Sequence, residues 1–184
     1  MNLKNLSNQF LLAMPHLDDS YFERSLVYIC QHDKNGSMGL IVNKPLNSNS
    51  SNPVLNELKL INLKPKPSVY IAGPVNLKAA MILHDNNYAL SNTIKLSSNL
   101  SLTSDRKILS DIKIGRGPIS FRIGLGYSGW TNGQLEEEIK NGDWFVLPMD
   151  SELIFNISDE KKWDYACNQI GININKISKH SGLA

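Results

Sequence analysis

Three short apolar segments near the start of the chain restrict the fold more than any other feature. Residues 9–14 (Gln-Phe-Leu-Leu-Ala-Met) and residues 25–31, which are rich in β-branched and aromatic side chains, are both predicted to be strands. The Asn35-Gly36 dipeptide then predicts a tight hairpin turn, because both central residues of a type I′ turn need a positive φ. A return strand over residues 38–43 completes a three-stranded block.

The rest of the chain mixes short strands and short helices without regular β-α-β alternation. Residues 47–52, which are all Asn or Ser, are predicted to form a polar loop. A chain that begins with hairpins and adds helices later is predicted to be α+β, here a single domain over residues 1–184 with a mixed, mostly antiparallel sheet and short flanking helices. The other predicted strands are 69–72, 80–84, 93–96, 119–125, 144–148 and 153–157. Helices are predicted at 54–60 after Pro53, at 105–113 with Thr103 or Ser104 as the cap, and at 159–170. A further short helix, with Leu135 and Ile139 on its apolar side, is predicted after a capping-box sequence at 131–134.

Composition and charge exclude several classes of protein. Hydrophobic residues make up 41% of the 184 residues and charged residues 20%, which is typical of a globular chain. Lys plus Arg exceed Asp plus Glu by only 19 to 17, so the net charge of +2 gives little attraction for a nucleic acid, and direct nucleic-acid binding is not expected. No apolar run approaches the roughly 18 residues of a membrane span, and the N-terminus lacks a signal-peptide segment, so we expect a cytoplasmic protein without membrane contact.

The segment Gly124-Leu-Gly126-Tyr-Ser-Gly129 matches the dinucleotide-binding pattern G-x-G-x-x-G. In that motif a pyrophosphate rests against the N-terminus of a helix that the glycines open. Here the predicted helix begins several residues after the third glycine, so the isolated match does not favour a dinucleotide. Ser128 also lacks the second glycine of a nucleophile elbow, since Trp130 stands there, and we interpret it as a turn residue.

Histidine and aspartate occur together at His16-Leu-Asp18-Asp19, His32-Asp33 and His84-Asp85. Such groups can bind a metal or form an acid–base pair, but no H-E-x-x-H, H-x-H or D-x-D-x-D-G spacing organises them. The two cysteines, Cys30 and Cys167, likewise form no Cys-x-x-Cys pair. We therefore predict neither a metal nor another cofactor. A polar pocket built partly from the first group is the better interpretation, because functional side chains concentrate on loops.

Six segments share residues with one known family, in order along nearly the whole chain: 10–25 (FLLAMPHLDDSYFERS), 38–45 (MGLIVNKP), 73–75 (GPV), 83–84 (LH), 125–130 (LGYSGW) and 133–138 (GQLEEE). These segments resemble the YqgE/AlgH family of bacterial proteins. The resemblance implies one compact α/β domain whose sheet is bifurcated and folded into a pseudo-barrel. Some members carry the label of transcriptional regulator, but this sequence has no helix-turn-helix pattern and no basic recognition helix.

Two positions depart from the family pattern. Members of the family usually end in Gly-His-Ala, whereas this chain ends Gly182-Leu183-Ala184, so any role of that histidine is lost or passes to His180. Gly124 is also outside the family pattern, which weakens the dinucleotide interpretation further.

Two functional hypotheses follow. The first is a non-enzymatic regulatory or binding module for a small molecule or a protein partner, because polar and glycine-rich motifs occur without a complete catalytic arrangement. The second is an enzyme, a hydrolase or a nucleotide-handling protein, that uses His16 with Asp18 or Asp19 as an acid–base pair. For the glycines and Trp130, tight packing of a strand, a turn and a helix is an equal alternative. The predicted binding pocket comprises His16, Asp18, Asp19, Arg24, Asn43, Gly73, Gly126, Tyr127, Trp130 and Gln134.

Overall fold

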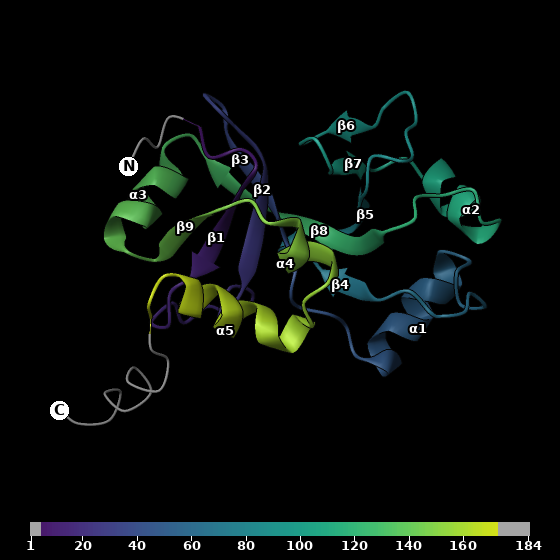
Figure 1. Ribbon diagram of the computed structural model, residues 1–184, viewed down its shortest axis with the longest axis horizontal. Coiled ribbons are helices and arrows are strands. Elements are labelled where there is room, and N and C mark those ends of the chain that lie inside the picture. The colour runs from purple at the N-terminus through teal and green to yellow at the C-terminus, as the bar shows by residue number, and fades with distance from the viewer. Residues whose placement is uncertain (1–4, 173–184) are drawn as a thin grey trace.

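The three N-terminal strands form an antiparallel block that is one part of a larger sheet. In the computed structural model, which describes residues 5–172, nine strands form this sheet in the order β6-β7-β5-β8-β3-β2-β1-β9, with β4 paired to β8 (Figure 1). The strands are β1 (Gln9–Ala13), β2 (Leu26–Asp33), β3 (Gly36–Ile41), β4 (Val69–Ile71), β5 (Val75–His84), β6 (Ile94–Lys95), β7 (Ser101–Thr103), β8 (Phe121–Thr131) and β9 (Trp144–Pro148). The helices are α1 (Ser48–Glu57), α2 (Lys107–Lys113), α3 (Gln134–Asn141), α4 (Ser151–Phe155) and α5 (Asp159–Gln169).

The sheet forks along β8, which is its longest strand. The end of β8 pairs with β3, where Gly39 lies opposite Ser128, whereas its first residues pair antiparallel with β5 and parallel with β4. After Gly39 the chain leaves β8, and the Ile41 N–H at the end of β3 donates to the Ala72 carbonyl, just after β4, at 2.9 Å. The predicted α+β fold, with a mixed, mostly antiparallel and bifurcated sheet folded into a pseudo-barrel, is therefore confirmed.

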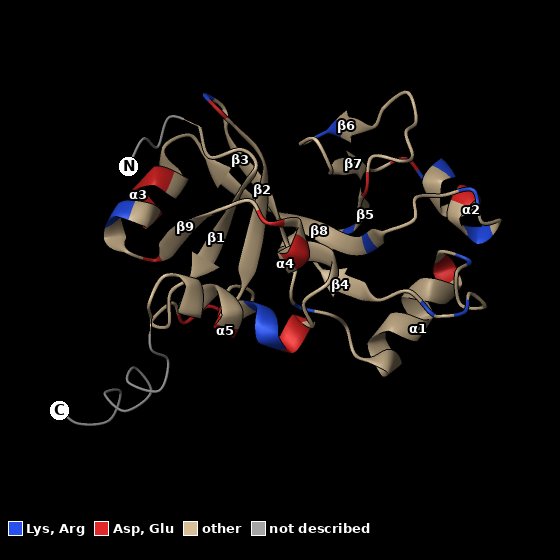
Figure 2. Cartoon of the chain, in the orientation of Figure 1, with Lys and Arg blue, Asp and Glu red and all other residues tan. Residues whose placement is uncertain are grey.

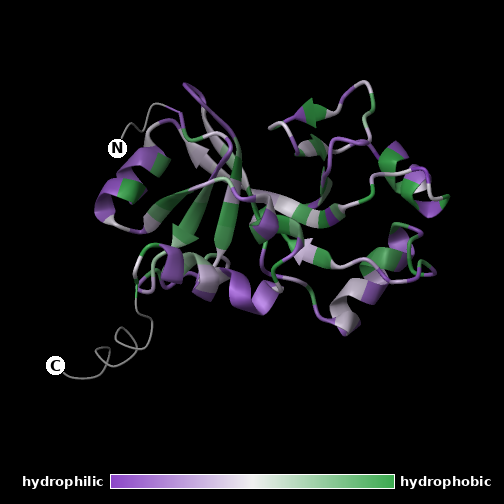
Figure 3. Ribbon diagram, viewed as in Figure 1, coloured by the Kyte–Doolittle hydropathy of each residue, from purple (hydrophilic) through white to green (hydrophobic). Residues whose placement is uncertain are grey.

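Three apolar clusters fill the spaces between the sheet and its helices. The largest lies at the fork and joins both branches, since Leu26 and Leu40 come from one branch and Leu83 and Leu102 from the other. Residues of α4 and α5 complete this cluster. Alternate residues of β1 and β2 point to the opposite face, where α3 closes the second cluster, and α1 and α2 close the third. Figure 3 shows the hydrophobic residues along β1 and β2 and hydrophilic residues on the visible side of α5.

Two helices differ from the prediction because of their caps. Helix α1 begins at Ser48, inside the run predicted to be a loop, since the Asn47 side chain accepts a backbone N–H of the first turn. Pro53 therefore lies within α1 rather than at its first position. The strand predicted at 153–157 is wrong: α4 occupies this region, and the Asp150 side chain caps it.

Other boundaries also differ. Strand β8 continues through residues 126–130, which were expected to turn, because this part of the strand pairs with β3 and β5. Helix α2 begins at Lys107, and Thr103 belongs to the unpredicted strand β7 instead of capping the helix. The first hairpin turns one residue earlier than predicted, since Gly36 already pairs with Asp33. Within residues 5–172, no helix combines the length and the apolar character needed to cross a membrane.

Candidate functional site

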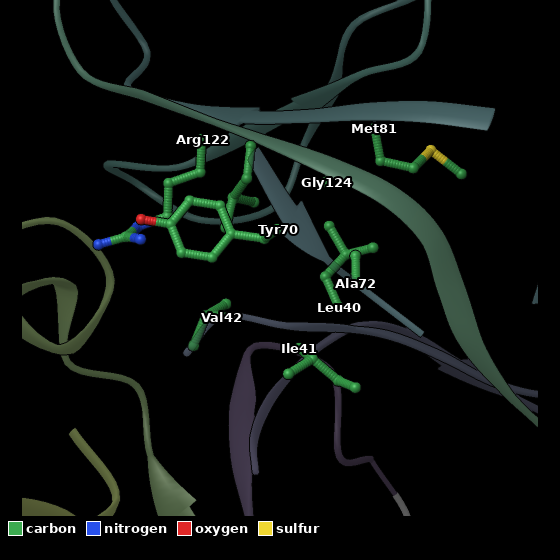
Figure 4. Close-up of a pocket in the computed structure, with 9 residues that line it drawn as sticks. Leu40, Ile41, Val42, Tyr70, Ala72, Met81, Arg122 and Gly124 are labelled. Atoms are coloured by element: carbon green, nitrogen blue, oxygen red, sulfur yellow. The ribbon is translucent and has the colours of Figure 1, made fainter. Parts of the chain in front are cut away.

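The candidate site is a cavity at the fork of the sheet, lined by residues of β3, β4, β5, β8 and the segments that follow β3 and β4. Its volume is about 240 Å³ including the open mouth, and its enclosed part has roughly the space of one water. Two of its lining residues are polar, Tyr70 and Arg122, and their side chains lie next to each other (Figure 4). The others are Leu40, Ile41, Val42, Ala72, Met81, Leu83 and Gly124.

A charged cluster borders this cavity, and we call it the Asp159 cluster. The Asp159 Oδ1 accepts hydrogen bonds from the Arg122 Nη1 at 3.1 Å and from the Lys162 Nζ, and its Oδ2 accepts the Tyr70 hydroxyl at 2.9 Å. The Arg122 Nε donates to the carbonyl of Ile154, and the guanidinium carbon lies 4.5 Å from the centre of the Tyr70 ring. The cluster therefore ties β4 and β8 to α4 and α5.

The Asp159 cluster is largely removed from solvent. The Lys162 side chain has no exposed surface, and the side chains of Arg122 and Asp159 are 12% and 18% exposed. Burial lowers the pKa of Lys162; its hydrogen bond to Asp159 raises the pKa and the charge of Arg122 lowers it further. Burial raises the pKa of Tyr70 to about 12, so the hydroxyl stays protonated. It donates a hydrogen bond to Asp159. Figure 2 shows the acidic and basic residues of the first turn of α5 side by side near α4.

The predicted loop residues His16, Asp18 and Asp19 lie between β1 and β2 but do not bond to one another. The His16 Nε2 lies 3.5 Å from the Asp143 Oδ1, and the His16 side chain is 60% exposed. The Asp19 Oδ1 accepts two backbone N–H groups of the turn that follows it, and Asp18 is exposed to solvent. The acid–base pair that the enzyme hypothesis requires is therefore not formed, because the turn uses Asp19 and His16 faces Asp143.

The structure does bring Arg24 and Asn43 together, through the backbone. The Asn43 Nδ2 donates to the Arg24 carbonyl at 2.9 Å, and its Oδ1 accepts the Leu26 N–H at 2.8 Å, which fixes the start of β2. The Arg24 side chain points to α5 instead, where its Nη2 donates to Asp164 at 2.8 Å and its guanidinium carbon lies 4.6 Å from the Trp163 ring. These contacts connect the loop to the sheet and to α5.

Gly73 and Gly126 mark a place where two backbone segments cross in contact. The φ of Gly73 is +153°, and a Cβ there would lie 2.1 Å from the carbonyl carbon of Tyr127. The φ of Gly126 is +71°, and a Cβ there would lie 2.6 Å from the Gly73 oxygen. Glycine is required at both positions because no side chain fits between the segments. The dinucleotide pattern is not formed either, since β8 continues through it and no helix begins there.

Trp130 and Gln134 belong to a second polar cluster, which we call the Glu138 cluster. The Glu138 Oε2 accepts the indole N–H groups of Trp130 and Trp144, both at 2.8 Å, and its Oε1 accepts the Gln134 Nε2 at 2.9 Å. The Gln134 Oε1 in turn accepts the Thr131 backbone N–H at 3.0 Å. The side chains of this cluster thus fix α3 against the ends of β8 and β9.

None of the residues of the Asp159 cluster is in the pocket predicted from the sequence. One signal could have identified Arg122, which is a charged residue within the apolar run of residues 119–125. Asp159 and Lys162 stand three residues apart on the predicted helix 159–170, a spacing that suggests a surface ion pair and gives no sign of burial. Their approach to Arg122 depends on the path of the sheet.

Within residues 5–172, no group of three or more His, Cys, Asp or Glu side chains is arranged to hold a metal ion. The C-terminal departure from the family pattern at Gly182-Leu183-Ala184, and the alternative residue His180, lie outside the described residues.

Comparison with known proteins places the whole chain beside one group of relatives. A model of the AlgH-like family matches residues 10–175. A UPF0301 protein from Shewanella oneidensis is 37% identical over 99% of this chain and 100% of its own length, and one from Ralstonia pickettii is 38% identical over 99% of this chain and 97% of its own length.

Two solved structures are similar in fold. The solution structure of the AlgH protein from Pseudomonas aeruginosa has a TM-score of 0.77 and 31% sequence identity, and the match covers 100% of this chain and 98% of that one. A crystal structure of a protein from Corynebacterium diphtheriae has a TM-score of 0.71 at 23% identity, covering 89% of this chain and 86% of that one, which supports the fold alone.

Proposed function

The chain belongs to the AlgH-like family, and we propose that it acts as a non-enzymatic regulatory module that binds a small molecule in the cavity at the fork of the sheet. The observation that carries this proposal is the position of the cavity, whose walls come from both branches of the sheet. A molecule bound there would contact both branches at once. Its binding would therefore change how the branches are held relative to each other, which is a means of regulation.

The chemistry of the walls favours binding over catalysis. Binding sites for small molecules are mostly apolar, with a few polar groups that orient the ligand. The fork cavity has this composition, since only Tyr70 and Arg122 among its lining residues are polar. Elsewhere, the buried His84 is engaged at both ring nitrogens, by the Asp85 carbonyl at 2.6 Å and by the Thr103 hydroxyl at 2.9 Å.

A role in transcription, which the family resemblance suggests, would then act through the bound molecule or through a protein partner. Direct contact with DNA is the weaker route, because a net charge of +2 offers little attraction to phosphates. The proposed location is the cytoplasm.

The proposal can be tested with a variant that fills the cavity. In Met81→Trp a larger side chain would fill the cavity that Met81 lines, and Leu77→Trp is the matched control because Leu77 is 45% exposed and does not line the cavity. A library of small organic fragments is screened by NMR against all three proteins. We expect fragments that shift resonances of the cavity residues in the wild type and the control but not in Met81→Trp. Fragment binding that Met81→Trp retains, or no binding to the wild type, would refute the proposal.

A further inference from the structure

We propose that the ligand of the fork cavity is a small carboxylate, whose charged end binds at Arg122 and whose short apolar end lies between the branches of the sheet. This inference rests on the proposed function, because it names the chemical class of the molecule that the cavity would hold. Three observations lead to it: the charges of the Asp159 cluster, its free hydrogen-bond donors and the shape of the cavity.

The first observation is a charge imbalance in a buried place. With their usual charges, Arg122 and Lys162 supply two positive charges, and Asp159 supplies one negative charge. The Tyr70 hydroxyl is neutral and donates to the same carboxylate, so both oxygens of Asp159 are already used. Uncompensated charge is costly to bury, and the side chains of both cations are at most 12% exposed. One anion at this position would balance the cluster.

The second observation concerns the donors that the cluster leaves free. A guanidinium has five N–H groups, and Arg122 uses its Nε for the Ile154 carbonyl and its Nη1 for Asp159. Within residues 5–172, its Nη2 donates to no protein acceptor. An ammonium has three donors, and Lys162 directs one of them to Asp159. Carboxylates and phosphates can both accept two parallel N–H groups of a planar guanidinium, and the carboxylate is the smaller of the two, which suits so small a cavity.

The third observation is the shape of the space beside these donors. Figure 4 shows the Arg122 guanidinium next to the Tyr70 hydroxyl, with Met81, Ala72 and Leu40 on the other side of the ring. A ligand that reaches both places must have a charged end and an apolar end. The enclosed space holds only about one water, so the apolar end can be only a short chain and the two branches must separate to admit it.

The burial of Lys162 agrees with this assignment. Burial lowers the pKa of its amine, the neighbouring Arg122 lowers it further, and the hydrogen bond and charge of Asp159 raise it. A bound carboxylate would add negative charge and would favour the protonated amine. The inference does not depend on this effect, since the geometry of Arg122 alone offers the free donors.

The test compares butanoate with butanamide, which have the same shape and differ in charge. Binding of each to the wild-type protein is measured by NMR titration at one ionic strength. We expect butanoate to bind at least about tenfold more tightly than butanamide, because a charged acceptor strengthens the hydrogen bonds of a guanidinium. Equal binding of the two probes, or tighter binding of butanamide, would overturn the inference without the need for any variant.

Variants then assign the site. Arg122→Met should abolish the preference for butanoate, and Arg122→Lys, which keeps the charge but not the planar donor group, should retain only part of it. Arg106→Met is the control, because Arg106 is exposed and does not line the cavity. Retention of the full preference in a folded Arg122→Met protein would overturn the inference.

The failure of this inference can be told apart from the failure of the proposed function. If butanamide and butanoate bind equally and Met81→Trp abolishes both, the cavity binds ligands but does not select carboxylates. If neither probe binds and no fragment binds in the earlier screen, both proposals are wrong. Butanoate binding that both Met81→Trp and Arg122→Met leave unchanged would place the anion elsewhere and would overturn the carboxylate assignment.

Discussion

The Asp159 and Glu138 clusters are both built on a carboxylate that collects hydrogen bonds at the junction of a helix and the sheet. Glu138 receives three neutral donors, two indoles and one amide, and its own single charge is the only one among these groups. Asp159 receives one neutral donor and two cations. Among residues 5–172, the first cluster therefore combines one negative charge with neutral donors, whereas the second has one excess positive charge and an Arg122 Nη2 without a protein acceptor.

This difference distinguishes the Glu138 cluster, which has a structural role, from the Asp159 cluster, which is a candidate binding site. The Glu138 cluster fixes α3, and adding an anion there would repel the carboxylate. The Asp159 cluster also fixes its helices, but its excess positive charge faces a cavity. Buried polar groups alone do not distinguish the two roles. What distinguishes them is the balance of donors, acceptors and charges.

The largest effect is expected for Asp159→Asn, which removes the only negative charge of its cluster. Two buried cations would then face each other, and we expect the free energy of unfolding to fall by about 3–5 kcal/mol in urea titrations. Asp164→Asn on the same helix is the control. Its partner Arg24 and Asp164 itself have side chains 54% and 47% exposed, so the loss should stay within about 1 kcal/mol. Equal losses in the two variants would contradict the comparison.

Glu138→Leu is expected to have the next largest effect. It leaves two indole N–H groups, on tryptophans that are 6% and 4% exposed, without an acceptor, and we expect a loss of about 2–3 kcal/mol. Glu138→Gln should lose clearly less, because its amide oxygen can still accept both indoles. Urea unfolding followed by tryptophan fluorescence measures both variants. If the Gln variant is as unstable as the Leu variant, the negative charge of Glu138, and not only its role as a hydrogen-bond acceptor, stabilises the fold.

The sequence predicts one of these clusters in part and misses the other. Trp130 and Gln134 are close in sequence to Glu138, and the spacing of residues 131–134 already indicated a helix start, so local patterns suffice to place them near α3. The first three strands and α5 are predictable for the same reason, since each has its own periodicity.

The Asp159 cluster cannot be predicted in this way. Tyr70 and Arg122 meet because β4 pairs in parallel with β8, and Asp159 reaches them only after the chain has formed β9 and α4. The strand predicted at 153–157 would have moved Asp159 away from Arg122. Local propensity does not determine such long-range pairings, so the fork cavity emerges only from the assembled sheet.

A smaller effect is expected from His84, which is buried and hydrogen-bonded at both ring nitrogens. Burial lowers the pKa of His84 from 6.5, so the folded state favours the neutral ring, which accepts the Thr103 hydroxyl at Nε2 and donates to the Asp85 carbonyl from Nδ1. This contribution to stability is complete above pH 6.5 and is lost as the pH falls from 6.5 toward the lowered pKa. The slope is at most about 1.4 kcal/mol per pH unit.

Urea unfolding of the wild type and of His84→Gln between pH 8 and pH 5 checks this prediction. The two stability curves should run parallel above pH 6.5, and the wild type should fall more steeply below it. Parallel curves over the whole range would show that protonation of His84 does not destabilise the folded state. The buried hydrogen bonds of His84 would then accommodate a positive charge, as the Asp159 cluster does.

The smallest effect is expected in the loop that the sequence favoured as a pocket. His16 faces Asp143 at 3.5 Å with a side chain that is 60% exposed, so His16→Asn should change the free energy of unfolding by no more than about 0.5 kcal/mol. The same variant should bind butanoate as tightly as the wild type does, because His16 does not line the fork cavity. NMR titration measures this second effect. If the His16→Asn protein is stable but no longer binds butanoate, the binding site lies in the loop and not at the fork. The excess charge of the Asp159 cluster would then have only a structural role.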